Sequence, residues 1–225
     1  MNKQQITAFA AKAILGGALM GASLAHAQFV VNGSLEGPVA NSGVPTGWTI
    51  LAGSPDTMNA SNNVGVSGLQ SFVAVPEASP DGGNWVGIGA DTGFVESFAQ
   101  TVSGLTVGVE YTLSWYAGNF GYAPLSYSNP NAIRATLNGV LLGTGASLPT
   151  SSQWVYESLN FVATSSSQVL AFQLDTSAKA YVSIDGIAIT TAVVPEPASM
   201  ALLLAGLAGV GLSASRTAKR RHHAA

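Results

Sequence analysis

The chain has 225 residues, of which 47% are hydrophobic and only 8% charged, and it contains no cysteine. The lack of cysteine excludes disulfides, thiolate metal sites and a cysteine nucleophile. All three histidines lie near the ends, at His26, His222 and His223. The long stretch between them can therefore form neither a Ser-His-Asp triad nor a histidine zinc site.

The N-terminal residues 1–27 have the pattern of a secretory signal peptide. Lys3 and Lys12 supply a positive start, and the run from Ala13 to Ala25 is uncharged and mostly apolar. Ala25-His26-Ala27 offers the small-x-small pattern that signal peptidase cleaves. The apolar run is too short for a membrane anchor, which needs about 20 residues. We therefore predict export and removal of this segment.

A second hydrophobic segment lies near the C-terminus. Ala198 to Ser215 carries no charge, and as a helix it would span about 27 Å, close to the hydrocarbon thickness of a bilayer. A basic tail, residues 216–225, follows at once. Arg216, Arg220 and Arg221 would hold that end in the cytoplasm by the positive-inside rule. The pattern predicts a transmembrane helix over 198–215, preceded by a linker at 192–197.

The linker contains the sequence Val194-Pro195-Glu196-Pro197. Two prolines break helix and sheet pairing and leave an extended, accessible segment. With the helix and basic tail that follow, this order resembles the PEP-CTERM sorting signal of Gram-negative bacteria. The resemblance implies transient inner-membrane anchoring, cleavage by an exosortase-type protease, and release or transfer to the cell surface. The alternative is a plain single-pass anchor after an incidental proline-rich linker.

The middle of the chain is acidic once both ends are set aside. Residues 28–194 hold ten acidic residues and two basic ones, Arg134 and Lys179, for a formal charge of −8. Nucleic acid is therefore excluded as a partner, because phosphate binding needs a basic surface. A calcium ion or a neutral ligand fits this charge better.

Alternating hydrophobic residues predict β-strands throughout residues 28–191. Tyr111 to Ala117 is the clearest such run, and similar runs lie near Phe161 and Phe172. Asn138-Gly139 between two apolar runs predicts a type I′ hairpin. No part of this region has a sustained helical period. We predict a single all-β sandwich of about ten strands.

Five segments of this region resemble the galactose-binding-like jelly rolls found in several carbohydrate-binding modules. They start at Phe29, Val44, Phe98, Trp154 and Val182, and they occur in the family's order. Leu35 stands where the family usually has Phe, and Gly186 where many members have Asp or Asn. The resemblance implies a jelly-roll β-sandwich over 28–191.

In such folds a structural calcium often joins the first and last strands, and the matching positions here are Glu36 and Asp185. Calcium takes six to eight oxygen ligands, so backbone carbonyls near Glu36 would have to contribute. The loss of a second acid beside Asp185 counts against this site. The alternative is that both residues are ordinary turn residues.

Carbohydrates stack their C–H faces on aromatic rings, and one segment concentrates such rings where a strand ends and a loop begins. We expect ligand contacts from its aromatic residues and one amide: Tyr116, Asn119, Phe120, Tyr122 and Tyr127. The alternative is that these rings cap the core. The four tryptophans are expected in the core.

The sequence favours a non-catalytic domain that works by binding or as a structural component of the cell envelope or an exopolysaccharide matrix. A first alternative is a carbohydrate-binding module with a defined polysaccharide site. A glycan-active enzyme is a more distant one, since a glycosidase needs only two carboxylates and ten acids make a chance pair easy to find. We expect signal peptidase and an exosortase-type protease as partners, and the cell surface or medium as the destination.

Overall fold

The structure is a computed structural model that describes residues 29–60 and 72–192. The predicted signal peptide, transmembrane helix and basic tail, and the Pro-Glu-Pro segment, lie outside the described residues. The part of the chain that is described contains no helix long and apolar enough to cross a membrane. Its one helical element is a single 3₁₀ turn, η1, at Ala123–Leu125.

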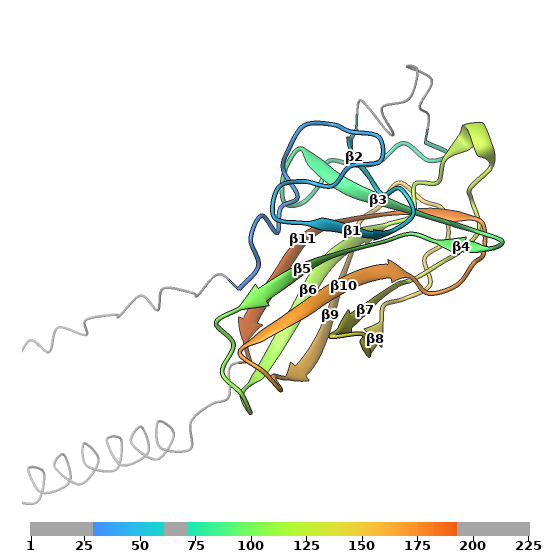
Figure 1. The fold of residues 1–225 in the computed structure, drawn as a ribbon. Helices are drawn as coiled ribbons and strands as arrows, with labels where there is room; N and C mark the ends of the chain where they lie inside the picture. The colour runs from blue at the N-terminus through green and yellow to red at the C-terminus, as the bar shows by residue number, and fades with distance from the viewer. Residues whose placement is uncertain (1–28, 61–71, 193–225) are drawn as a thin grey trace, which may run out of the picture.

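Eleven strands form two antiparallel sheets packed face to face in the described region (Figure 1). One sheet has the order β1-β5-β10-β7-β8 and the other β2-β3-β11-β6-β9, with the short β4 paired to β3. The strands are β1 (Thr49–Ala52), β2 (Asp56–Asn59), β3 (Asn84–Asp91), β4 (Phe94–Val95), β5 (Ser97–Ser103), β6 (Glu110–Gly118), β7 (Ile133–Leu137), β8 (Val140–Thr144), β9 (Val155–Val162), β10 (Ser167–Leu174) and β11 (Ala180–Thr191).

The strand order is that of a jelly roll. Eight strands, β3 and β5 to β11, divide into the sheets β3-β11-β6-β9 and β5-β10-β7-β8. The chain thus passes between sheets in the double Greek-key manner that defines this fold. The all-β sandwich predicted from the sequence is confirmed.

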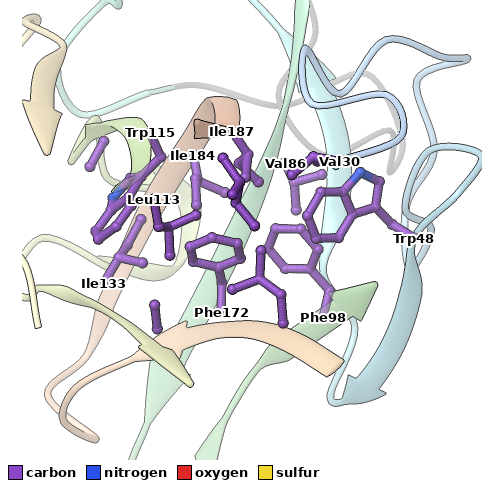
Figure 2. Packing of buried hydrophobic residues seen from close by; sticks show 14 of the residues in the cluster. Val30, Trp48, Val86, Phe98, Leu113, Trp115, Ile133, Phe172, Ile184 and Ile187 are labelled. Atoms are coloured by element: carbon purple, nitrogen blue, oxygen red, sulfur yellow. The ribbon is translucent and has the colours of Figure 1, made fainter. Parts of the chain in front are cut away.

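Alternating residues of both sheets fill the space between them (Figure 2). Leu113 and Trp115 of β6 face Phe172 of β10, and Trp115 meets Phe172 edge to face at 5.6 Å between ring centroids. Trp48 packs against Phe98 at one side of this layer, with 5.0 Å between their ring centroids (Figure 2). The predicted inward faces of β6 and β10 are confirmed, since their alternate apolar residues are buried.

The hairpin turn predicted at Asn138-Gly139 is confirmed. Asn138 and Gly139 both have positive φ, 49° and 77°, and connect β7 to β8 as a type I′ hairpin. Near the N-terminus, Leu35 also has positive φ and is fully buried in the core. It occupies the place where the resembling family has an aromatic residue.

Candidate functional site

Three tyrosines from two distant parts of the chain form one wall of a pocket of about 520 Å³. Tyr181 comes from β11, whereas Tyr122 and Tyr127 flank the η1 turn. Their ring centroids lie 6.0 to 6.4 Å apart, so each ring contacts the other two. The pocket is further lined by Asn41, Gly53, Ser54, Asp56, Gly89, Phe94, Glu96 and Leu125.

The pocket lies on the outer face of the six-stranded sheet. Along β11, Ala180 and Val182 belong to the core between the sheets, so Tyr181 must point the other way. Its neighbours on β3 are glycines: Tyr181 pairs with Gly89, and Gly87 lies two residues away on the same face of the strand. A Cβ on Gly87 would lie 2.4 Å from the Tyr181 ring. The two glycines therefore make room for the ring to lie flat on the sheet.

Asp56 is a buried carboxylate at the floor of this pocket, with 4% of its surface exposed. Its Oδ2 accepts a hydrogen bond from the Tyr181 hydroxyl at 2.5 Å, and its Oδ1 accepts one from the Ser42 backbone N–H at 2.7 Å. Burial raises the pKa of Asp56 to about 6 from its ordinary 3.8, although both hydrogen bonds act to lower it. Burial likewise raises the pKa of Tyr181, which the charge of Asp56 raises further.

Glu96 is the second buried carboxylate of the pocket. Its Oε1 accepts hydrogen bonds from the backbone N–H and the hydroxyl of Ser54, and its Oε2 accepts one from the Gly89 N–H at 2.7 Å. The charge of Glu96 contributes to the raised pKa of Asp56. None of the described residues that line the pocket is basic, so the pocket is an acidic, aromatic hollow.

Of the residues that the sequence predicted as ligand contacts, Tyr122 and Tyr127 line the pocket. Asn119 and Phe120 instead lie in the interior. Asn119 donates from Nδ2 to the carbonyls of Asn129 and Leu148, which fixes the loop that carries the two tyrosines. These two residues therefore position the pocket without facing it.

Phe120 belongs to a second aromatic cluster on the same outer sheet face. It packs with Trp85 and Trp154, whose ring centroids lie 5.3 Å apart edge to face. Met58 and Tyr181 are also buried in this cluster, so it extends to the pocket. The prediction that the tryptophans lie in the core is confirmed for Trp48, Trp85 and Trp115, whereas Trp154 is only partly buried against the second cluster.

Tyr116, the remaining predicted contact, lies elsewhere on the outer face of this sheet. It pairs across the strands with Tyr156 of β9, and their ring centroids are 5.4 Å apart. Tyr156 is 57% exposed. The two rings form a separate aromatic surface that does not line the pocket.

The predicted calcium residues lie near each other, where the N-terminal segment meets the β11 bulge. Asp185 is fully buried, and burial raises its pKa to about 7. Hydrogen bonds from Ser79 and from the Gly186 N–H act to lower that pKa, and the charges of Asp81 and Glu36 act to raise it. The three acids thus share one electrostatic environment.

The hydrogen bonds of Glu36 join the N-terminal segment to the start of β3. Glu36 accepts from the N–H groups of Gly83 and Asn84 and from the Asn84 side-chain amide. N–H donors that point at a carboxylate take the place that a cation would need. Within residues 29–60 and 72–192, no three His, Cys, Asp or Glu side chains are grouped to hold a metal ion. The calcium site stays a prediction.

Sequence reasoning missed Asp56, Glu96 and Tyr181. They come from three separate segments, and no short motif joins them. One signal was available: Gly87 and Gly89 alternate with apolar residues in the middle of β3. Glycine inside a strand often marks a place where another group approaches the backbone closely. Here that group is the Tyr181 ring.

Comparison with known proteins gives a family match for the C-terminal segment. The model of the PEP-CTERM protein-sorting motif matches residues 193–220. The chain therefore carries the sorting signal expected from Val194-Pro195-Glu196-Pro197 and the segments after it. This signal implies export, membrane anchoring and processing by an exosortase on the way to the cell surface. A search of curated proteins finds no significant match.

Solved structures resemble the sandwich at low identity. A family 16 carbohydrate-binding module is 16% identical over 72% of this chain and 99% of its own, with a TM-score of 0.44. A complex of TmCBM61 with β-1,4-galactotriose is 13% identical over 74% and 99%, with a TM-score of 0.43. The active domain of tailspike protein 4 of bacteriophage CBA120 is 15% identical over 73% of this chain, with a TM-score of 0.46. The chain spans only 21% of that tailspike chain. The jelly-roll assignment rests on the strand order described above.

Proposed function

We propose that this is a sorted cell-surface protein whose β-sandwich binds carbohydrate, without catalysis, in the pocket walled by Tyr122, Tyr127 and Tyr181. The sorting motif at residues 193–220 supports delivery to the surface. The pocket supports the binding role. Polysaccharide of the envelope or of a secreted matrix is the ligand such a protein would meet there.

The observation that carries the binding proposal is the combination of size and lining. A volume of about 520 Å³ lies in the range typical of small-ligand sites, about 300 to 1,000 Å³. Tyrosine rings offer apolar faces to the C–H groups of a sugar together with a polar hydroxyl. The carboxylates of Asp56 and Glu96 are acceptors for sugar hydroxyls. Such convergence of aromatic walls and a few acceptors is typical of a specific site.

The same two carboxylates raise the alternative of a glycan-active enzyme, because Asp56 has a pKa of about 6 in an open pocket. Their hydrogen bonds argue for binding. Both oxygens of Glu96 accept N–H or O–H donors from the protein, and Asp56 is held by Tyr181 and Ser42. A nucleophile or acid must be able to reach the glycosidic bond. We therefore favour a role for Asp56 and Glu96 in binding a glycan over a role in its hydrolysis.

A purely structural matrix protein is the second alternative. Such a protein would self-associate or be retained in the envelope but would show no preference among glycans. Binding to a glycan array, lost in a pocket variant, separates the two cases. Release of reducing sugar from a bound glycan would instead establish the enzyme.

Two measurements on protein recovered from its host test the proposal. The intact mass should correspond to a chain that begins near Gln28 and ends near Pro195; a product that keeps Ala198–Ala225 would overturn sorting. Glycan binding should be saturable and should weaken at least about tenfold in Tyr122→Ala, a loss of about 1.4 kcal/mol. Tyr156→Ala, which removes an exposed ring outside the pocket, is the matched control and should bind like the wild type.

A further inference from the structure

We infer that the tyrosine pocket selects sugars that carry a free ammonium group, such as a hexosamine residue without its acetyl group, over neutral and acidic sugars. This inference rests on the proposed carbohydrate binding and adds the class of sugar. It follows from the charge of the pocket, the unfilled acceptor positions of its carboxylates and the chemistry of its aromatic wall.

The charge of the pocket is uniformly negative. Asp56 and Glu96 are both nearly buried, with 4% and 6% of their surfaces exposed. No described lining residue carries a positive charge to balance them. Buried carboxylates are costly unless they are paired. A cationic ligand would supply the partner that the lining residues lack.

The two carboxylates also have acceptor positions left for a ligand. An ionised carboxylate offers about four lone-pair sites. The hydrogen bonds described above give Asp56 two donors and Glu96 three. An ammonium group has three donors and no acceptor. It could therefore contact both acids, and such charge-assisted bonds are about twice as strong as neutral ones.

The aromatic wall suits the same group, because cations are attracted to the faces of tyrosine rings. A contact between an ammonium group and a tyrosine ring already exists at one edge of the pocket. The Lys179 ammonium lies 5.0 Å from the centroid of the Tyr127 ring and 3.6 Å from Oδ2 of Asp91. Lys179 is thus partnered by Asp91, beside the pocket, and does not line it. The two inner carboxylates have no equivalent partner among the lining residues.

Neutral and acidic sugars should bind to this pocket with lower affinity than ammonium sugars. A neutral sugar can donate hydroxyl groups to Asp56 and Glu96 but gains no ion pair. An acidic sugar would bring a third negative charge to two that are already desolvated, and like charges repel strongly there. Acetylation of the amine removes its charge and adds bulk. The expected order of affinity is therefore ammonium sugar, neutral sugar, acidic sugar.

Calorimetric titration of the processed protein with three oligosaccharides of equal length tests this order. The probes are a glucosamine oligomer with free amines, its fully N-acetylated counterpart and a galacturonate oligomer. The free-amine oligomer should bind at least about tenfold more tightly than the acetylated one at low salt, and added salt should reduce the difference. The galacturonate oligomer should bind most weakly.

Variants of the pocket carboxylates test whether the preference for the free-amine oligomer arises in the pocket. Asp56→Asn and Glu96→Gln should each bring the free-amine and acetylated oligomers close to equal affinity, with folding checked by circular dichroism. Asp175→Asn removes an exposed acid that does not line the pocket and should keep the wild-type ratio. A tenfold preference that survives in both pocket variants would show that the amine binds the acidic surface elsewhere, and would overturn the inference.

The comparison of ligands separates this inference from the proposed function. Equal binding of the free-amine and acetylated oligomers by the wild type would overturn the ammonium preference and leave carbohydrate binding standing. Binding of none of the three oligomers would overturn the ammonium preference, and a glycan array without any saturable ligand would overturn the proposed function. Because the acetyl group is changed on the ligand, this test does not depend on any variant folding.

Discussion

The hydroxyl of Tyr181 donates a hydrogen bond to Oδ2 of Asp56 at 2.5 Å, across 125 positions of the chain. The bond joins the last strand, β11, to the edge strand β2 at the floor of the pocket. It forms on the outer face of the sheet, away from the apolar core. The pocket is thus held together by polar contacts between these two strands.

Removing the Tyr181 hydroxyl is expected to destabilise the domain. In Tyr181→Phe the buried carboxylate of Asp56 loses one of its two donors, which costs about 1–3 kcal/mol of the free energy of unfolding. Urea denaturation at pH 7 measures this loss. Tyr156→Phe removes the hydroxyl of an exposed ring and should leave the midpoint unchanged. Equal midpoints for the two variants would contradict the role assigned to the Tyr181–Asp56 bond.

Asp56 should make stability depend on pH. Its pKa in the folded protein, about 6, lies above its ordinary value of 3.8, so the folded state holds the proton more tightly. The stabilisation is therefore complete below pH 3.8 and is lost as the pH rises through 6. Between pH 4 and 7.5 the free energy of unfolding should fall by about 1–3 kcal/mol more in the wild type than in Asp56→Asn.

Denaturation curves of both proteins at several pH values measure that difference. Asp175→Asn is the control, because Asp175 is exposed, and its pH profile should follow the wild type. An Asp56→Asn profile parallel to the wild-type one would show that the Asp56 carboxyl does not titrate as described.

The glycines of β3 should be intolerant of side chains. In Gly87→Ala the new Cβ would lie 2.0 Å from the Met58 methyl group and 2.4 Å from the Tyr181 ring. Overpacking of this kind costs about 1–3 kcal/mol, and the displaced ring should also weaken glycan binding. Gly83→Ala places its Cβ in open space and is the matched control. Thermal melts and glycan titrations of both variants check this, and wild-type values for Gly87→Ala would contradict it.

Glu36 should act as a clamp on the N-terminal segment. Glu36→Gln replaces a charged acceptor of three N–H groups by an amide with one oxygen, at an expected loss of about 1–3 kcal/mol. If calcium binds here, as the family resemblance implies, calcium will raise the melting temperature of the wild type and a chelator will lower it. Asp185→Asn should abolish both effects. Identical melts with calcium and with chelator would exclude a stabilising calcium.

Much of the fold was predictable because its determinants are local or periodic. The alternation in Tyr111–Ala117 predicted the buried face of β6, and Asn138-Gly139 predicted the turn after β7. The strand order was not readable from these patterns. It depends on contacts between strands far apart in sequence, such as β3 with β11, and here the family resemblance supplied the jelly roll.

The pocket was predictable only in part. Tyr122 and Tyr127 lie within one aromatic segment and could be singled out from composition. Asn119 and Phe120 lie in the same segment but are buried, because the loop folds back over the sheet and needs its own polar and apolar anchors. Tyr181 lies between the apolar residues Ala180 and Val182 of β11, so the sequence does not indicate that its ring faces outward. Asp56 and Glu96 look like ordinary acids until the fold buries them.

Isotope-labelled tyrosine gives the most direct test of where this domain binds its ligand. The chain has six tyrosines, of which Tyr122, Tyr127 and Tyr181 line the pocket and the half-buried Tyr116 and exposed Tyr156 form the separate pair. In NMR spectra of the processed protein, titration with a bound oligosaccharide should shift the ring signals of the three pocket tyrosines and leave those of Tyr116 and Tyr156 unchanged. Shifts confined to Tyr116 and Tyr156 would place the ligand on the open sheet face and contradict the proposed site.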